Sequence, residues 1–157
     1  MKSCDIVSVI YCHYSKADDF GESSSQGADR SAIMKHCFES LVKNTRDYPA
    51  ELIVMDNGGN PDDSDYFLEH IRKGNINIYI RYKENMHFAY AWNDGERIAS
   101  GNILAFVCND IGFQKGWLPA CVDILNKYPQ VIATPFITYG KGKYTRTLES
   151  GERQNFR

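Results

Sequence analysis

The sequence predicts an α/β fold in which a mostly parallel β-sheet is covered by helices on both faces. Short apolar runs rich in Val and Ile recur along the chain, and such runs are typical of buried strands. Segments with helical spacing of apolar residues stand between them, and this alternation favours parallel βαβ units. With 157 residues, 43% hydrophobic and 24% charged, the chain has the size and composition of one globular domain over residues 1–157.

The first strand and the first helix are separated by a polar segment. Residues 5–12 (DIVSVIYC) are predicted to form a buried strand. Residues 15–29 contain GESSSQGAD, which can bury little apolar surface, so we expect a mobile loop there. A helix is expected over residues 29–44, because Asp29 can cap its N-terminus and apolar side chains follow at helical spacing.

A second strand is predicted at residues 51–55 (ELIVM), and Asp-Asn-Gly-Gly follows it as a turn. Pro61, followed by two aspartates, indicates the start of the next helix, because proline and acidic residues suit a first helical turn. Residues 76–82 (INIYIRY) alternate between apolar and polar side chains and suit a third strand.

The second half of the chain continues the alternation. We expect a helix at residues 87–100, weakened by an internal glycine, and a fourth strand at residues 103–107. A further helix is predicted at residues 117–128, with its proline in the first turn, and a fifth strand at residues 131–136. The tail from residue 140 is polar and poorly patterned.

Ligands of parallel α/β sheets bind beyond the carboxyl ends of the strands. The sequence therefore predicts functional residues within residues 12–14, 56–59, 82–87 and 108–110. All four segments are polar, aromatic or glycine-rich, which is consistent with a binding site at one edge of the sheet.

Several function classes are excluded or disfavoured. A net charge of −2 without a basic stripe argues against binding to nucleic acid. No apolar run approaches the roughly 20 residues that cross a bilayer. The dinucleotide, P-loop and serine-hydrolase glycine motifs are absent. Five cysteines without a CxxC pair favour reduced thiols, so we expect a cytoplasmic protein, with peripheral attachment to a membrane left open.

The strand-end residues suit a nucleotide. Asp56 and Asn57 have the hydrogen-bonding groups for a base or ribose edge, and Tyr14 has a ring for stacking. Asp110 offers a hard oxygen ligand for a divalent cation, and a cation bound to a diphosphate needs only one or two protein carboxylates. The alternative is that Asp-Asn-Gly-Gly and Asp110 are ordinary turn residues.

Three segments together resemble the family 2 glycosyltransferases of GT-A fold, a Rossmann-like domain. They are DIVSVIYCHYSK, ELIVMDNGGN and NMHFAYAWNDGERIASGNILAFVCNDIGFQKGWL, in the order and spacing of the family's blocks. The resemblance covers residues 5 to 135. It implies a nucleotide-sugar site formed by Cys12, Tyr14, Asp56, Asn57, His87, Asn109 and Asp110.

The same resemblance assigns roles and shows two departures. Asp110 would be the ligand of Mg²⁺ or Mn²⁺, and Asn109 a contact to ribose or phosphate. Asn93 and Gly95 match a motif with a structural role. Cys108 replaces the first aspartate of the family's metal motif, and His87 stands where glycine is common.

By resemblance, the reaction would be transfer of a sugar from a nucleotide-diphosphate donor to a glycan or other acceptor hydroxyl, with inversion. We expect this chain to lack most of the acceptor-binding half of a full enzyme. Glu149 and Glu152 lie in no family block, so no catalytic base is assigned. The alternatives are a non-catalytic nucleotide- or glycan-binding module, a sugar-nucleotide nucleotidyltransferase, and a domain used only for protein contacts.

Overall fold

The computed structural model describes residues 6–16, 30–128, 130–135, 138–139, 143–147 and 153–156. Its contacts divide the chain into two compact units, Met1–Gly116 and Trp117–Arg157, which we describe separately. The predicted loop lies outside the described residues from position 17 to 29, as do Glu149 and Glu152. The single-domain organisation stays a prediction.

The first unit contains a four-stranded sheet with the order β3-β2-β1-β4. Every neighbouring pair in it is parallel, which confirms the predicted fold class. The strands are β1 (Val7–His13), β2 (Ala50–Asp56), β3 (Ile78–Arg81) and β4 (Ile103–Cys108). All four predicted strands of this unit are present, and the register pairs His13 with Asp56 and Cys12 with Cys108, so their carboxyl ends meet at one edge.

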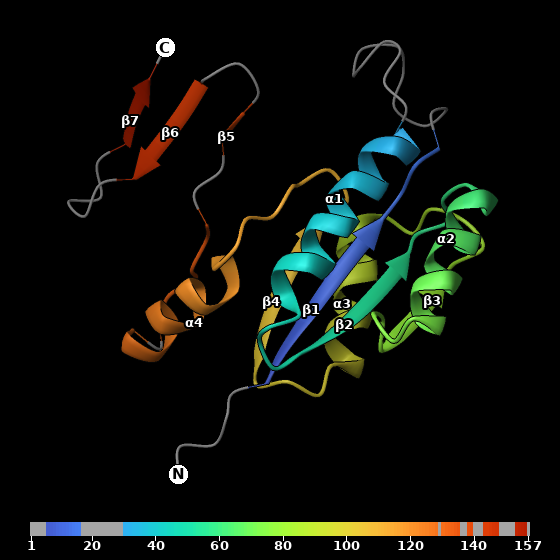
Figure 1. Cartoon of the computed structure of the whole chain (residues 1–157), viewed down its shortest axis with the longest axis horizontal. Coiled ribbons are helices and arrows are strands. Elements are labelled where there is room, and N and C mark those ends of the chain that lie inside the picture. The colour runs from blue at the N-terminus through green and yellow to red at the C-terminus, as the bar shows by residue number, and fades with distance from the viewer. Residues whose placement is uncertain are drawn as a thin grey trace. The chain divides into compact units, whose positions relative to one another are not determined.

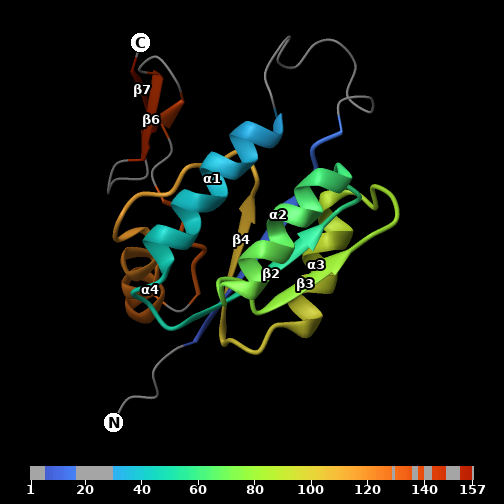
Figure 2. The ribbon, with the colours of Figure 1, turned by 45° about the vertical axis from the view of Figure 1, so that its right-hand side comes forward.

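Helices cover both faces of the sheet, as predicted. Figures 1 and 2 show α1 (Arg30–Thr45) and α2 (Pro61–Arg72) on one face and α3 (Phe88–Ile98) on the other. The face under α1 and α2 is held by aromatic packing. The ring centroid of Tyr11 lies 5.1 Å from that of Phe38 and 6.2 Å from that of Phe67, and all three side chains are fully buried.

The face under α3 is formed by alternate residues of the same strands. Ile10 and Met55 belong to a buried cluster there. Gly95 explains how α3 lies so close to the sheet, because a Cβ at this position would lie 2.4 Å from Cγ2 of Ile10. The helix thus contains a residue of poor helix propensity because close packing of the sheet requires it.

Within the described residues, the second unit contains one helix and a three-stranded antiparallel sheet. Its helix α4 (Trp117–Lys127) confirms the predicted element. The strands are β5 (Thr138–Tyr139), β6 (Lys143–Thr147) and β7 (Arg153–Phe156), in the order β5-β6-β7. No helix in the described part of the chain has the length and apolar character needed to cross a membrane.

The predicted fifth strand at residues 131–136 is wrong over residues 131–135, which form a bend and irregular chain. Residue 136 lies outside the described residues. The apolar run predicted a buried strand, but Pro135 has no N–H for a ladder hydrogen bond and restricts Thr134 before it. The strands of the polar tail were missed because their side chains do not show a clear apolar alternation.

Candidate functional site

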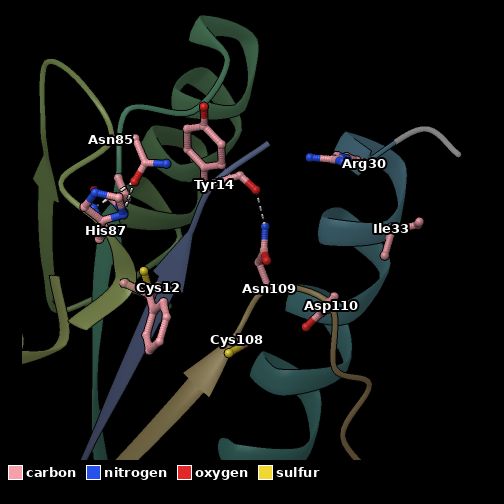
Figure 3. Close-up of a pocket in the computed structure, with 11 residues that line it drawn as sticks. Cys12, Tyr14, Arg30, Ile33, Asn85, His87, Cys108, Asn109 and Asp110 are labelled. Atoms are coloured by element: carbon pink, nitrogen blue, oxygen red, sulfur yellow. Dashed lines mark hydrogen bonds between the residues drawn. The ribbon is translucent and has the colours of Figure 1, made fainter. Parts of the chain in front are cut away.

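A pocket of about 790 Å³ lies at the carboxyl edge of the parallel sheet in the first unit (Figure 3). This volume is within the range of small-molecule sites. The pocket is lined by Cys12, Tyr14, Arg30, Ile33, Asn57, Asn85, His87, Phe88, Cys108, Asn109 and Asp110. The structure thus brings together all the residues predicted for the site except Asp56.

Two asparagines shape the loop between β3 and α3. Nδ2 of Asn57 donates a hydrogen bond to Oδ1 of Asn85 at 2.9 Å, and Oδ1 of Asn57 accepts one from the backbone N–H of Met86 at 2.8 Å. Oδ1 of Asn85 also accepts from the backbone N–H of His87 at 2.9 Å, as Figure 3 shows. These bonds fix the loop where it enters the pocket.

His87 has a strained backbone. His87 occupies the N-cap position of α3 with φ 63° and ψ 149°. Among the described residues it is the one non-glycine residue with a positive φ. This region is nearly restricted to glycine and costs about 1–3 kcal/mol for other residues. The asparagine bonds hold His87 in this conformation, and its side chain lines the pocket.

Asp56 lies outside the pocket and is fully buried. Its Oδ2 accepts hydrogen bonds from the hydroxyl of Tyr79 and from Nη1 of Arg81, both at 2.7 Å, and from the hydroxyl of Ser64 at 3.0 Å. Its Oδ1 accepts from the backbone N–H of Gly59 at 2.9 Å. A direct contact between Asp56 and a nucleotide stays a prediction, and this carboxylate already supports β3 and the turn after β2.

Asn109 and Asp110 follow β4 and lie in the pocket side by side (Figure 3). Nδ2 of Asn109 donates to the backbone carbonyl of Tyr14 at 2.8 Å. Asp110 is exposed. The chain after it is tied to α1, because the backbone N–H of Phe113 donates to Oγ of Ser40 at 2.8 Å. The carboxylate of Asp110 is therefore available to a ligand on an anchored turn.

Cys12 and Cys108 are register partners on β1 and β4, and both line the pocket. Burial, with a smaller contribution from Cys108, raises the pKa of the Cys12 thiol to about 12. Burial also raises the pKa of Cys108. Both thiols are neutral at physiological pH, so this wall of the pocket carries no charge.

Sequence reasoning missed Arg30, Ile33 and Phe88 of the pocket wall, and it covered Asn85 only as part of the predicted segment 82–87. Arg30 and Ile33 come from the first turn of α1, and Figure 3 shows the Arg30 side chain extended toward Tyr14. Asn85 and Phe88 flank His87. A general feature of the fold would have indicated these residues. Helices that follow parallel strands begin at the edge where the strands end, so their first turns border a site there.

The side chains that could coordinate a divalent cation in the pocket can be compared with what such a cation requires. The described residues hold no group of three or more His, Cys, Asp or Glu side chains that could hold a metal by themselves. Asp110 supplies one carboxylate and Asn109 one amide beside it. This set fits a cation that is brought and mainly coordinated by a diphosphate, since such a cation needs only one or two protein carboxylates.

Comparison with known proteins supports the resemblance to a family of glycosyltransferases. The sequence profile described as Glycosyl transferase family 2 matches residues 29–156. The chain belongs to glycosyl transferase family 2. A search of curated proteins found no significant match for the chain.

Solved structures of S. aureus TarS share the GT-A fold of this family 2 glycosyltransferase chain. TarS 1-349 in complex with UDP-GlcNAc superposes with a TM-score of 0.59 at 18% identity, covering 78% of this chain and 32% of that one. A further TarS structure gives 0.59 at 15% identity, covering 90% and 25%. TarS 1-349 gives 0.60 at 16% identity, covering 92% and 42%. The chain thus spans less than half the length of these structures.

Proposed function

We propose that this family 2 glycosyltransferase chain binds a nucleoside-diphosphate sugar in the pocket at the carboxyl edge of its sheet, together with Mg²⁺ or Mn²⁺ at Asp110. One observation carries the proposal: all the predicted site residues except Asp56, although far apart in the sequence, line a single pocket. The pocket combines a guanidinium group, a carboxylate and three amide side chains. These groups match the cationic, metal-binding and hydrogen-bonding needs of a nucleoside diphosphate.

The base, the ribose and the diphosphate of the donor each have a proposed contact. The ring of Tyr14 and the amide of Asn57 suit the base and ribose. The guanidinium of Arg30, which donates to the carbonyl of Lys16 at 3.1 Å, suits the diphosphate. A divalent cation held by Asp110 would neutralise charge on the leaving diphosphate. Cys12 and Cys108 provide a neutral wall, and His87 stands at the entrance to α3.

The reaction we propose is transfer of the sugar to an acceptor hydroxyl with inversion. The general base and the acceptor contacts are not assigned to described residues. Free thiols at all four cysteines that the structure describes support a cytoplasmic location. A UDP-sugar is the first donor to test, because TarS was solved with UDP-GlcNAc.

Thermal denaturation with UDP, GDP and ADP, each with and without MnCl₂, tests the donor site. We expect a nucleoside diphosphate to raise the melting temperature of the wild-type chain, and Mn²⁺ to increase the effect. Asp110→Asn should lose the increase that Mn²⁺ causes. Asp65→Asn is the matched control, because Asp65 is an exposed carboxylate on α2. The proposal fails if no nucleotide shifts the melting temperature under any of these conditions.

A non-catalytic nucleotide-binding module is the second candidate function. It is favoured by Cys108, whose raised pKa leaves a neutral thiol where the family's motif has a carboxylate. A UDP-sugar that binds to the full-length natural protein, but is neither transferred nor hydrolysed, would support this candidate. Release of UDP from the bound donor would support the transferase.

A further inference from the structure

His13 is a fully buried imidazole that lies between Asp63 of α2 and Asn109 of the proposed donor site. It ends β1, and its ring packs against Phe67 with centroids 5.1 Å apart. Its Nε2 lies 3.2 Å from Oδ2 of Asp63, which is also fully buried, on α2. On the other side, its Nδ1 lies 3.2 Å from Nδ2 of Asn109. His13 itself is not part of the pocket wall.

The neighbours of Asn109 determine the orientation of its amide. The backbone carbonyl of Tyr14, 2.8 Å from Nδ2, can only accept, so the group facing it is the amide NH₂. The same NH₂ faces Nδ1 of His13, so its second hydrogen requires an unprotonated Nδ1. The ring proton of His13 then belongs on Nε2, which lies 3.2 Å from Oδ2 of Asp63. Each step leaves one consistent arrangement.

Asp63 is held in place from several sides. Burial alone would raise its pKa, but contacts with His13, Ser15 and Ser31 outweigh burial and lower the pKa to about 2. Oγ of Ser31 donates to Oδ2 of Asp63 at 3.0 Å. Gly59 leaves room for the imidazole, because a Cβ there would lie 2.6 Å from Nε2 of His13.

We propose that His13 and Asp63 are positioning residues that fix the Asn109 amide with its carbonyl oxygen, rather than its NH₂, toward the donor. This inference rests on the proposed function of the pocket. Because both amide hydrogens are used inside the protein, Oδ1 is the polar atom that Asn109 presents beside the Asp110 carboxylate. Two adjacent oxygens attract an electropositive group, which is either a ribose or sugar hydroxyl or the divalent cation. Without a cation between them, these oxygens repel phosphate oxygens, so the phosphates contact the protein directly at Arg30 rather than at Asn109 and Asp110.

The proton position can be measured without any ligand. Long-range ¹H–¹⁵N NMR correlations of the wild-type chain distinguish the protonated from the unprotonated ring nitrogen of each histidine, and the signals of His13 are identified by their loss in His13→Asn. We expect Nε2 to carry the proton of His13 and Nδ1 to carry none. A proton on Nδ1 would overturn the inference, because the Asn109 amide could not then be held as described.

Two substitutions separate the two nitrogens of His13. The Oδ1 of an asparagine takes the place of Nδ1 and keeps the acceptor for Asn109, whereas the amide of a glutamine reaches the place of Nε2 and keeps only the donor for Asp63. Both variants lose the ring packing on Phe67. We therefore expect His13→Gln to weaken UDP binding about five- to tenfold more than His13→Asn, the effect of losing about one hydrogen bond.

UDP affinity is measured for both variants by calorimetry, with and without MnCl₂. A difference confined to Mn²⁺ assigns Oδ1 of Asn109 to the cation, and the same difference without Mn²⁺ assigns it to a hydroxyl. Equal losses in both variants would overturn the positioning role. If wild type binds neither UDP nor GDP, the proposed function falls and the ligand role of Asn109 with it, while the NMR measurement still decides the proton position.

Discussion

Replacing His87 with glycine should stabilise the fold and weaken donor binding. The φ of 63° and ψ of 149° at His87 lie in a region that costs a residue with a Cβ about 1–3 kcal/mol, and glycine avoids this cost. Glycine also gives the unfolded chain more conformational entropy than alanine does, which lowers the free energy of unfolding by about 0.4–1 kcal/mol. The difference predicts that His87→Gly is more stable than His87→Ala by about 0.5–2 kcal/mol.

The alanine variant is the matched control, because it removes the imidazole and keeps the Cβ. For a chain of this length, the predicted difference corresponds to a melting temperature about 1–8 °C higher in His87→Gly. Urea denaturation of both variants, followed by circular dichroism, measures the free energies of unfolding. Calorimetric titration with UDP and Mn²⁺ should show weaker binding in both, because each lacks the side chain that lines the pocket. A glycine variant no more stable than the alanine variant would refute the strain.

Three further predictions concern the sheet and its edge. Arg81→Met should lower the free energy of unfolding by about 3 kcal/mol, because it leaves the buried Asp56 carboxylate without its cation. Arg97→Met, which breaks an exposed pair, should cost less than about 1 kcal/mol in the same urea titration. In the folded chain the pKa of Asp63 is about 2, below its ordinary value of 3.8. Asp63 therefore contributes about 2 kcal/mol to the free energy of unfolding above about pH 4, and this contribution is lost as the pH falls toward 2. The free energies of unfolding of wild type and Asp63→Asn should converge as the pH approaches 2. Plots of these free energies against pH that stay parallel would contradict the reasoning. Because its pKa is raised to about 12, Cys12 should react with iodoacetamide at neutral pH far more slowly in the native chain than in urea, as peptide mass spectrometry measures, and equal rates would contradict the burial.

The four strands of the first unit could be predicted because each is a short apolar run followed by turn residues. The prediction failed at residues 131–135, where the same kind of run contains a proline and forms no strand. It also missed β6 and β7, whose polar side chains carry no apolar pattern. An apolar run indicates that a segment can be buried in a sheet, but pairing with neighbouring strands decides whether it is.

The position of the pocket was predicted from the strand ends, but the role of Asp56 shows the limit of that reasoning. Side chains alternate along a strand, so Asp56 shares the face of Val54 and points beneath α2, together with His13. Asn57, one residue later, reaches the pocket. Alternation could have suggested this division, whereas the contact of His13 with Asn109 depends on three-dimensional packing that no spacing in the sequence reveals.

Calorimetric titration of the wild-type chain with UDP in the presence of Mn²⁺ tests the central claim most directly. The pocket geometry predicts saturable binding that weakens when Mn²⁺ is removed, and that weakens about tenfold or more in Asp110→Asn, because a charged contact is lost. Asp65→Asn should bind as wild type does. Binding that is unaffected by both the metal and Asp110→Asn would contradict the metal site, and the absence of binding by UDP and GDP alike would contradict the donor site itself.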